Sequence, residues 1–123
     1  MSFEIRWLGT ACFEIRLQNR KTIVIDPYVD DSVSVPFTSD IIEGCDYVFI
    51  THGHYDHVLD VGKLAKRFEP EIFCSREVAA ALNLHQGIEP NRCTHVTVGD
   101  VVERDGVRAE IVHGVHVDFA ASY

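Results

Sequence analysis

The hydrophobic positions at the start of the chain follow the two-residue period of β-strands. Residues 3–8 and 11–17 both alternate between apolar and polar side chains, as half-buried strands do. Gly9 and Thr10 between them offer a tight hairpin turn. Residues 22–25 lack this alternation, which is typical of a strand that is covered on both faces. The pattern predicts a hairpin followed by a central strand.

The pattern changes from strand to helix in the middle of the chain. Residues 46–51 predict a strand. Apolar residues then recur at positions 58, 61, 65 and 68, which lie on one face of an amphipathic helix. Pro70 ends this helix because it cannot continue the helical hydrogen bonds. The spacing therefore predicts one helix over residues 58–68.

A second strand and helix follow directly. Residues 72–74 predict a short apolar strand. Ser75 is placed to cap a helix that runs from residue 76 to about residue 84, and Gly87 closes it.

The C-terminal third returns to strand patterns. Residues 94–98 alternate, and Asp105-Gly106 is a strong hairpin signal between residues 101–103 and a last strand over residues 107–117. Strands that alternate with two helices predict an α/β fold with a mixed sheet.

The segment of residues 28–40 has mixed polarity and no helical period, so it is predicted to be a loop. Its aspartates, Asp30, Asp31 and Asp40, are interpreted as a solvated acidic loop rather than as metal ligands. Loops of this length in a small domain are often functional, and this one is interpreted as a flap that faces the substrate.

Length and charge narrow the classes of function. A chain of 123 residues is expected to form a single domain over residues 1–123. The net charge of −8 disfavours a nucleic-acid partner, which needs a patch of Lys and Arg. No run approaches the roughly 20 apolar residues that span a bilayer, and the N-terminus does not resemble a signal peptide. We therefore expect no membrane partner, a cytoplasmic location and reduced cysteines, with Cys12 and Cys74 as small core residues.

The chemistry of the chain is concentrated in one short stretch after the predicted strand of residues 46–51. This stretch has three histidines and one carboxylate within six residues: His52, His54, Asp56 and His57. Imidazoles and carboxylates are ligands of zinc and similar divalent ions. Since side chains two residues apart in an extended segment point the same way, the first two histidines can bind one ion together.

The motif His-x-His-x-Asp-His after a hydrophobic strand resembles the signature of the metallo-β-lactamase superfamily of metal-dependent hydrolases. The resemblance implies the α-β-β-α sandwich of that family, or its N-terminal αβ half alone. It also bears on Asp26, which by itself is equally well explained as a turn former before Pro27. In the family a strand that ends in Asp-Pro places this acid beneath the metal site, where it accepts the second N–H of a ligating imidazole.

The resemblance further implies a histidine near the end of the last strand. Both His113 and His116 lie there, and the register of a strand over residues 107–117 favours His116 as the ligand. His52, His54 and His116 would then hold one metal ion, and Asp56 with His57 would form a depleted second position. The expected cofactor is Zn²⁺, with iron or manganese as alternatives, in one or two copies.

The family members usually have two similar αβ halves, and the resemblance covers only the first. The aspartate that bridges two metals and the final histidine of the second position have no counterpart here. A half sandwich would expose the sheet face that its other half covers, and such apolar patches favour association. We therefore expect one of three things: a homo-oligomer or another association through that face, a C-terminal segment that is missing from this apparently truncated domain, or a fragment of low stability.

The function implied by the resemblance is hydrolysis of a small-molecule ester, lactone or phosphoester. In this interpretation the metal activates a water molecule, and Asp56 orients that water or takes its proton as a general base. The alternative is a non-catalytic metal-binding or association module that keeps the motif but not a complete two-metal centre.

Overall fold

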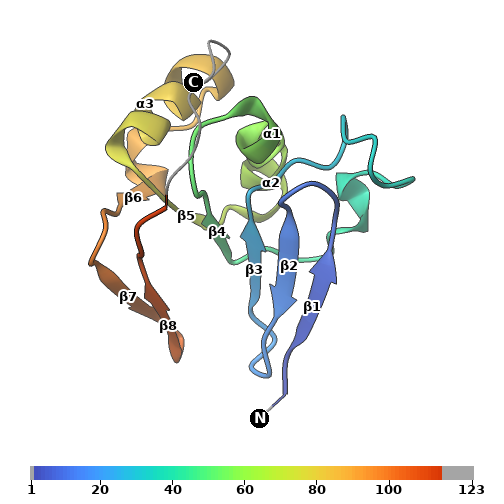
Figure 1. Cartoon of the computed structure of the whole chain (residues 1–123), viewed down its shortest axis with the longest axis horizontal. Helices are drawn as coiled ribbons and strands as arrows, with labels where there is room; N and C mark the ends of the chain where they lie inside the picture. Colours follow the sequence, from blue (N-terminus) through green and yellow to red (C-terminus); the bar gives the residue numbers. More distant parts are fainter. Residues whose placement is uncertain (1, 115–123) are drawn as a thin grey trace.

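A six-stranded mixed sheet forms the centre of the molecule, and its strands lie in sequence order (Figure 1). In this computed structural model, which describes residues 2–114, strands β1 to β3 pair antiparallel and strands β3 to β6 pair parallel. The strands are β1 (Glu4–Trp7), β2 (Phe13–Arg16), β3 (Thr22–Ile25), β4 (Tyr47–Phe49), β5 (Glu71–Cys74) and β6 (Cys93–His95). The predicted α/β class and the opening hairpin are confirmed.

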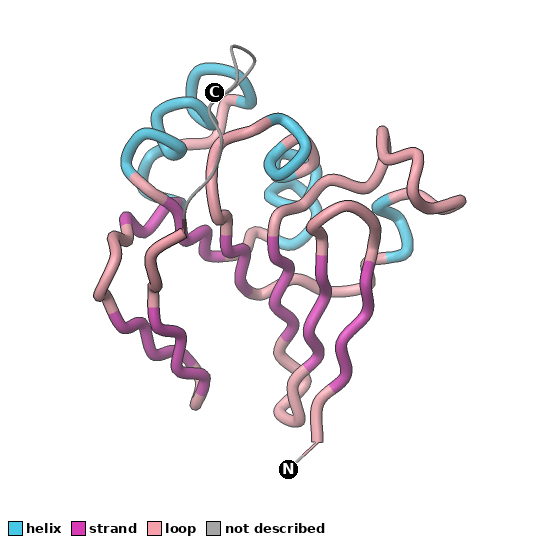
Figure 2. The backbone as a smooth tube through the Cα atoms, viewed as in Figure 1, coloured by secondary structure: helices cyan, strands magenta, loops and turns pink. Residues whose placement is uncertain are grey.

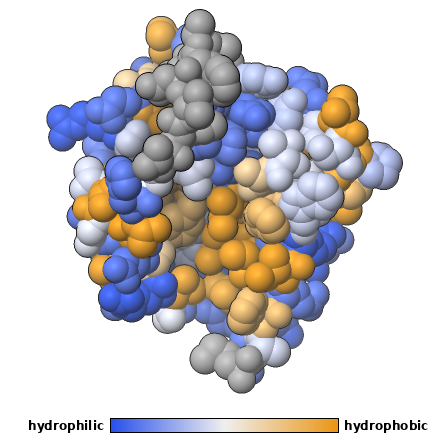
Figure 3. Space-filling view, viewed as in Figure 1, coloured by the Kyte–Doolittle hydropathy of each residue, from blue (hydrophilic) through white to orange (hydrophobic). Residues whose placement is uncertain are grey.

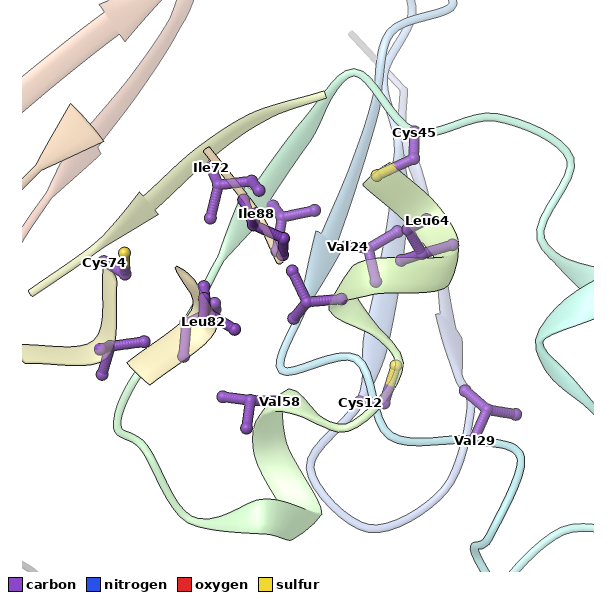
Figure 4. Close-up of a cluster of buried hydrophobic side chains, with 14 of the residues drawn as sticks. Cys12, Val24, Val29, Cys45, Val58, Leu64, Ile72, Cys74, Leu82 and Ile88 are labelled. Atoms are coloured by element: carbon purple, nitrogen blue, oxygen red, sulfur yellow. The ribbon is translucent and has the colours of Figure 1, made fainter. Parts of the chain in front are cut away.

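Three α-helices cover one face of this sheet: α1 (Tyr55–Val58), α2 (Val61–Phe68) and α3 (Arg76–Gln86). Two short 3-10 helices, Ser39–Ile41 and Pro90–Arg92, complete the helical elements of residues 2–114. Apolar side chains of the helices and of the central strands form one buried cluster, part of which Figure 4 shows. Cys12 and Cys74 belong to it and are fully buried, as predicted. None of the helices in the described part of the chain is long and apolar enough to traverse a bilayer.

The single helix predicted over residues 58–68 is wrong, because the chain breaks between α1 and α2. The side chain of Asp60 does not cap α2 but accepts hydrogen bonds from the backbone of Val29, at 2.6 Å, and of Asp30, at 3.0 Å. The backbone N–H of Asp60 donates to the carbonyl of Pro27. These contacts with a loop that is distant in the sequence end α1. The helical spacing of the apolar residues therefore continues across the break between α1 and α2.

The second predicted helix is confirmed with its caps. The hydroxyl of Ser75 accepts a hydrogen bond from the backbone N–H of Val78 at 3.1 Å. Gly87 follows α3 with a φ of 67°, the left-handed conformation that glycine adopts without steric cost. α3 is therefore fixed at both ends by local sequence.

The opposite face of the sheet is covered in part by a hairpin of β7 (Val101–Arg104) and β8 (Val107–Glu110). Val102 packs with Tyr47 and Phe73 of the sheet. Arg104 forms two hydrogen bonds, both of 2.9 Å, with the carboxylate of Glu71. These contacts attach the hairpin to β4 and β5.

The last predicted strand is too long. β8 ends at Glu110, and residues 111–114 have no regular secondary structure. The reason lies in β7, the strand that pairs with β8. The chain turns at Gly99, with a φ of 95°, and β7 begins only at Val101. Ile111 still forms backbone hydrogen bonds with this turn, but β7 has no backbone groups with which the residues after Ile111 could pair. The register argument that favoured His116 over His113 therefore loses its basis.

Strands β1 and β2 keep an uncovered apolar face. Figure 3 shows hydrophobic side chains gathered over these strands in the view of Figure 1. Three large side chains on it are well exposed: Ile5 at 56%, Trp7 at 52% and Phe13 at 38%. Ile5 pairs with Ile15, and Trp7 with Phe13, so the exposed residues share one side of the sheet.

The predicted loop of residues 28–40 connects β3 to the first 3-10 helix and is drawn mostly without regular structure in Figure 2. Asp30 accepts a hydrogen bond from the backbone of Ser39 at 2.6 Å and pairs with Lys63 of α2. Burial alone would raise the pKa of Asp30, but these bonds outweigh it and lower that pKa. Asp30 thus holds the loop against α2, and the role of the loop as a flap stays a prediction.

Candidate metal centre

The histidine motif lies where the chain leaves the sheet. Strand β4 ends at Phe49, Ile50 still donates its backbone N–H to the carbonyl of Phe73 at 3.0 Å, and α1 begins at Tyr55. His54 is the residue before α1 and has an extended backbone, with φ of −65° and ψ of 146°. Residues 51–54 therefore form a short segment without regular secondary structure at the carboxyl end of a parallel strand, a common position for ligand sites in α/β sheets.

Asp26 lies beside this segment and forms two hydrogen bonds with it and a third with α1. Its carboxylate accepts hydrogen bonds from the backbone N–H of Thr51 at 2.7 Å, from the Thr51 hydroxyl at 2.6 Å and from Nδ1 of His57 at 2.8 Å. Its side chain is 2% exposed. Because Nδ1 of His57 donates to the carboxylate, the lone pair of the ring is on Nε2, the atom that a metal needs.

The same carboxylate acts on a second histidine through Thr51. The hydroxyl of Thr51 has one proton, which it donates to Asp26. It can therefore only accept from Nδ1 of His52, which lies 2.9 Å away, and this leaves the lone pair of His52 on Nε2. One buried carboxylate thus sets the tautomers of His52 and His57.

The imidazole rings of the motif lie against one another. The centroid of the His52 ring is 4.6 Å from that of His54 and 4.0 Å from that of His57. Asp56, in the first turn of α1, has Oδ1 3.6 Å from Nε2 of His57. The structure therefore brings four of the five predicted ligands close together, three imidazoles and one carboxylate.

This donor set fits a divalent ion of the zinc type in the kind of its ligands. Within residues 2–114, no three His, Cys, Asp or Glu side chains converge closely enough to hold an ion in their present rotamers. The fifth predicted ligand, His116, lies outside the described residues. His113 is exposed in the segment after β8. The assignment of ligands stays a prediction.

Sequence reasoning missed Thr51 as a part of this site. The residue stands next to the first histidine, but its role depends on Asp26, which is 25 positions away in the chain. The adjacency of β3 and β4, with Ile25 opposite Phe49, brings the two together. The sequence signal was the common feature of the two strands: each is an apolar run that ends in a polar residue.

Comparisons with known proteins bear on this arrangement. The sequence profile of a family described as the metallo-beta-lactamase superfamily matches residues 5–120. A UPF0173 metal-dependent hydrolase from Koribacter versatilis is 33% identical over 117 residues, which cover 92% of this chain and 47% of that protein. The chain spans about half the length of the relatives that it matches.

Two solved structures share the fold. Igni18, described as a novel metallo hydrolase from Ignicoccus hospitalis, superposes with a TM-score of 0.77 at 21% identity, over 98% of this chain and 52% of that one. A structure described as a new diphosphatase from the PhnP family superposes with a TM-score of 0.55 at 19% identity, over 79% of this chain and 40% of that one.

Proposed function

Because this chain belongs to the metallo-beta-lactamase superfamily, we propose that it supplies the metal ligands of a hydrolase that acts on a small-molecule ester, lactone or phosphoester. The observation that carries the proposal is the buried carboxylate of Asp26, which orients His57 directly and His52 through Thr51. A surface loop that is merely rich in histidine needs no such support, whereas metal ligands are regularly oriented by a carboxylate behind them.

The proposed ligands divide into two groups. His52, His54 and His116 are proposed to hold one ion, and Asp56 with His57 to contribute to a second position. Zinc is the proposed ion, and iron or manganese suits the same donors. When bound, the ion supplies a water molecule whose pKa is lowered to about 7.

Asp56 is the proposed general base. It stands in the first turn of α1, its side chain is partly exposed, and Oδ1 lies 3.6 Å from Nε2 of His57. It is therefore next to the atoms proposed to bind the ion, and it can accept a proton from a water molecule there. His57 cannot take that proton at Nδ1, because this atom already donates to Asp26.

The choice among substrates rests on relatives only. The relatives from several bacteria and archaea are named metal-dependent hydrolases, and a structure with the same fold is described as a diphosphatase. These names support hydrolysis in general, and the diphosphatase shows that the same fold can serve the hydrolysis of a phosphate linkage. The second candidate is a non-catalytic metal-binding module, which would bind the ion through the same residues without turnover.

The test is metal content and turnover of the purified chain after reconstitution with zinc, iron or manganese. We expect one or two ions per chain, and loss of metal in His52→Ala and His116→Ala. His95→Ala is the matched control, because His95 is exposed on β6 and outside the site. A phosphodiester and ester screen then follows. Bound metal without turnover would favour the non-catalytic module, and no metal with any of the three ions would overturn the proposal.

Association through the uncovered face of β1 and β2 is also proposed. Monomeric proteins rarely expose a contiguous apolar patch of this kind without a function for it. We propose that a second copy of the chain packs against Ile5, Trp7 and Phe13, because a two-fold interface between copies would bury this face on both. The mass in solution tests this proposal.

A further inference from the structure

A cavity of about 230 Å³ lies between α1 and α3, beside the candidate metal centre. Most of its wall is apolar and comes from the two helices. Figure 4 labels two of these wall residues, Val58 of α1 and Leu82 of α3, in the part of the core where the helices meet. The full lining is Gly53, Val58, Leu59, Val78, Ala81, Leu82, His85 and Gln86.

The cavity is continuous with the histidine motif on both sides. Gly53, which contributes to the wall, stands between the proposed ligands His52 and His54. Val58, on the other side, directly follows His57. A group that occupies the cavity is therefore in contact with the same short segment that carries the proposed metal ligands.

The polar groups of the lining are largely committed to the fold. Oε1 of Gln86 accepts from the backbone N–H of Gly62 at 2.7 Å, and Nε2 of Gln86 donates to the carbonyl of Val58 at 2.9 Å. Gln86 thus holds the C-terminal end of α3 against α1 and α2. The remaining wall offers a ligand mainly aliphatic surface, with His85 as its titratable member.

The volume decides what the cavity can hold. An apolar cavity of about 150 Å³ is enough to bind benzene, whereas pockets for whole drug-sized ligands begin at about 300 Å³. A volume of about 230 Å³ therefore suits one phenyl-sized or short alkyl group, and not an entire substrate.

We propose that this cavity binds an apolar aryl or alkyl group of the substrate whose ester or phosphoester group lies at the metal centre. The proposal rests on the proposed function and deepens it, because it assigns the substrate to compounds with one compact hydrophobic substituent. Val58 and Leu82 contact that substituent, and Ala81 determines how large it can be.

The first test measures binding without metal and without turnover. Ala81→Leu fills the cavity from a half-buried lining position, and Ala80→Leu makes the same change at an exposed neighbour that does not line it. Leucine keeps the helix propensity of both positions high. Fluorobenzene is titrated into the metal-free full chain and followed by ¹⁹F NMR. We expect line broadening that is lost in Ala81→Leu and retained in Ala80→Leu. No broadening with folded protein, or equal broadening with both variants, overturns the proposal.

The second test connects the cavity to the metal centre. The zinc-loaded chain is titrated calorimetrically with phenylphosphonate and methylphosphonate, which are not hydrolysed. Burial of one phenyl group predicts about 10- to 100-fold tighter binding of the phenyl compound, a preference that Ala81→Leu removes. Equal binding of the two compounds overturns the assignment of the cavity to the substrate. Failure of both to bind refutes the metal site and this assignment together, while the fluorobenzene result separately decides whether the cavity binds apolar groups.

Discussion

Replacement of Asp26 by Asn tests whether one carboxylate sets the tautomers of two histidines. Asn has nearly the same shape, and it tolerates the left-handed backbone of Asp26, where φ is 48°. Its carbonyl can still accept from the backbone N–H of Thr51. Its amide, however, is a donor, and it faces the two atoms that now donate to Asp26: the Thr51 hydroxyl and Nδ1 of His57.

The consequence for metal binding follows from the proton positions. If Nδ1 of His57 must accept from an amide, the ring proton moves to Nε2 and the lone pair that would bind the ion is lost. The Thr51 hydroxyl can likewise turn its proton toward His52, with the same effect on that ring. Loss of such a partner typically weakens metal binding by about 10- to 100-fold, or about 1.4 to 2.7 kcal/mol. With two rings affected, we expect the upper end of this range for Asp26→Asn.

Thr51→Val provides the matched comparison, because it removes only the link to His52. We expect a smaller loss of zinc affinity than in Asp26→Asn, since the bond between Asp26 and His57 remains. The assay is a zinc competition titration against a chromophoric chelator, with urea unfolding of the metal-free proteins measured in parallel to separate misfolding from loss of the site. Zinc affinity of folded Asp26→Asn equal to that of the wild type would refute the reasoning.

Three further predictions concern stability and association. The hydrogen bonds of Arg104 hold the pKa of Glu71 below its usual value. The ionised carboxylate therefore stabilises the fold above about pH 4.3, and this stabilisation is lost as the pH falls through the pKa of the folded state. Between pH 7 and 3, the melting temperature of Arg104→Ala should therefore fall by less than that of the wild type. Leu64→Ala should lower the free energy of unfolding in urea by about 2 to 5 kcal/mol, because Leu64 lies fully buried on the inner face of α2. Ile5→Lys should reduce the mass in analytical ultracentrifugation to that of one chain, whereas Val33→Lys, on the exposed loop, should not; an unchanged mass in Ile5→Lys would contradict the association face.

Much of the fold was predictable because local signals agreed with the tertiary structure. The alternation in β1 and β2, the cap at Ser75 and the closing Gly87 each act within a few residues. The break between α1 and α2 was not predictable in this way. The break depends on the hydrogen bonds between Asp60 and the backbone of residues 29 and 30, and the spacing of the apolar residues does not indicate that contact.

In the candidate site, too, some features could be predicted from the sequence and others depend on the tertiary structure. The clustering of His52, His54, Asp56 and His57 was visible in the sequence because the residues are close along the chain. The relay from Asp26 through Thr51 was not, because it depends on which strands are neighbours and on the direction in which they run. The cavity beside the motif also escaped prediction, since its walls come from two helices that meet only in the folded chain.

The position of Asp26 in the sheet explains why the residue that orients the histidines has a left-handed backbone conformation. β3 is the strand at which the sheet changes from antiparallel to parallel pairing, so its carboxyl end lies beside that of β4. The backbone N–H of Asp26 still donates to Phe49 at 3.0 Å, and the left-handed φ of 48° then turns the chain out of the sheet. That conformation costs about 1 to 2 kcal/mol, whereas each hydrogen bond to a charged group contributes about 1.5 to 3 kcal/mol. The three bonds to Thr51 and His57 therefore outweigh the strain, and the turn after β3 and the histidine motif stabilise each other as one unit.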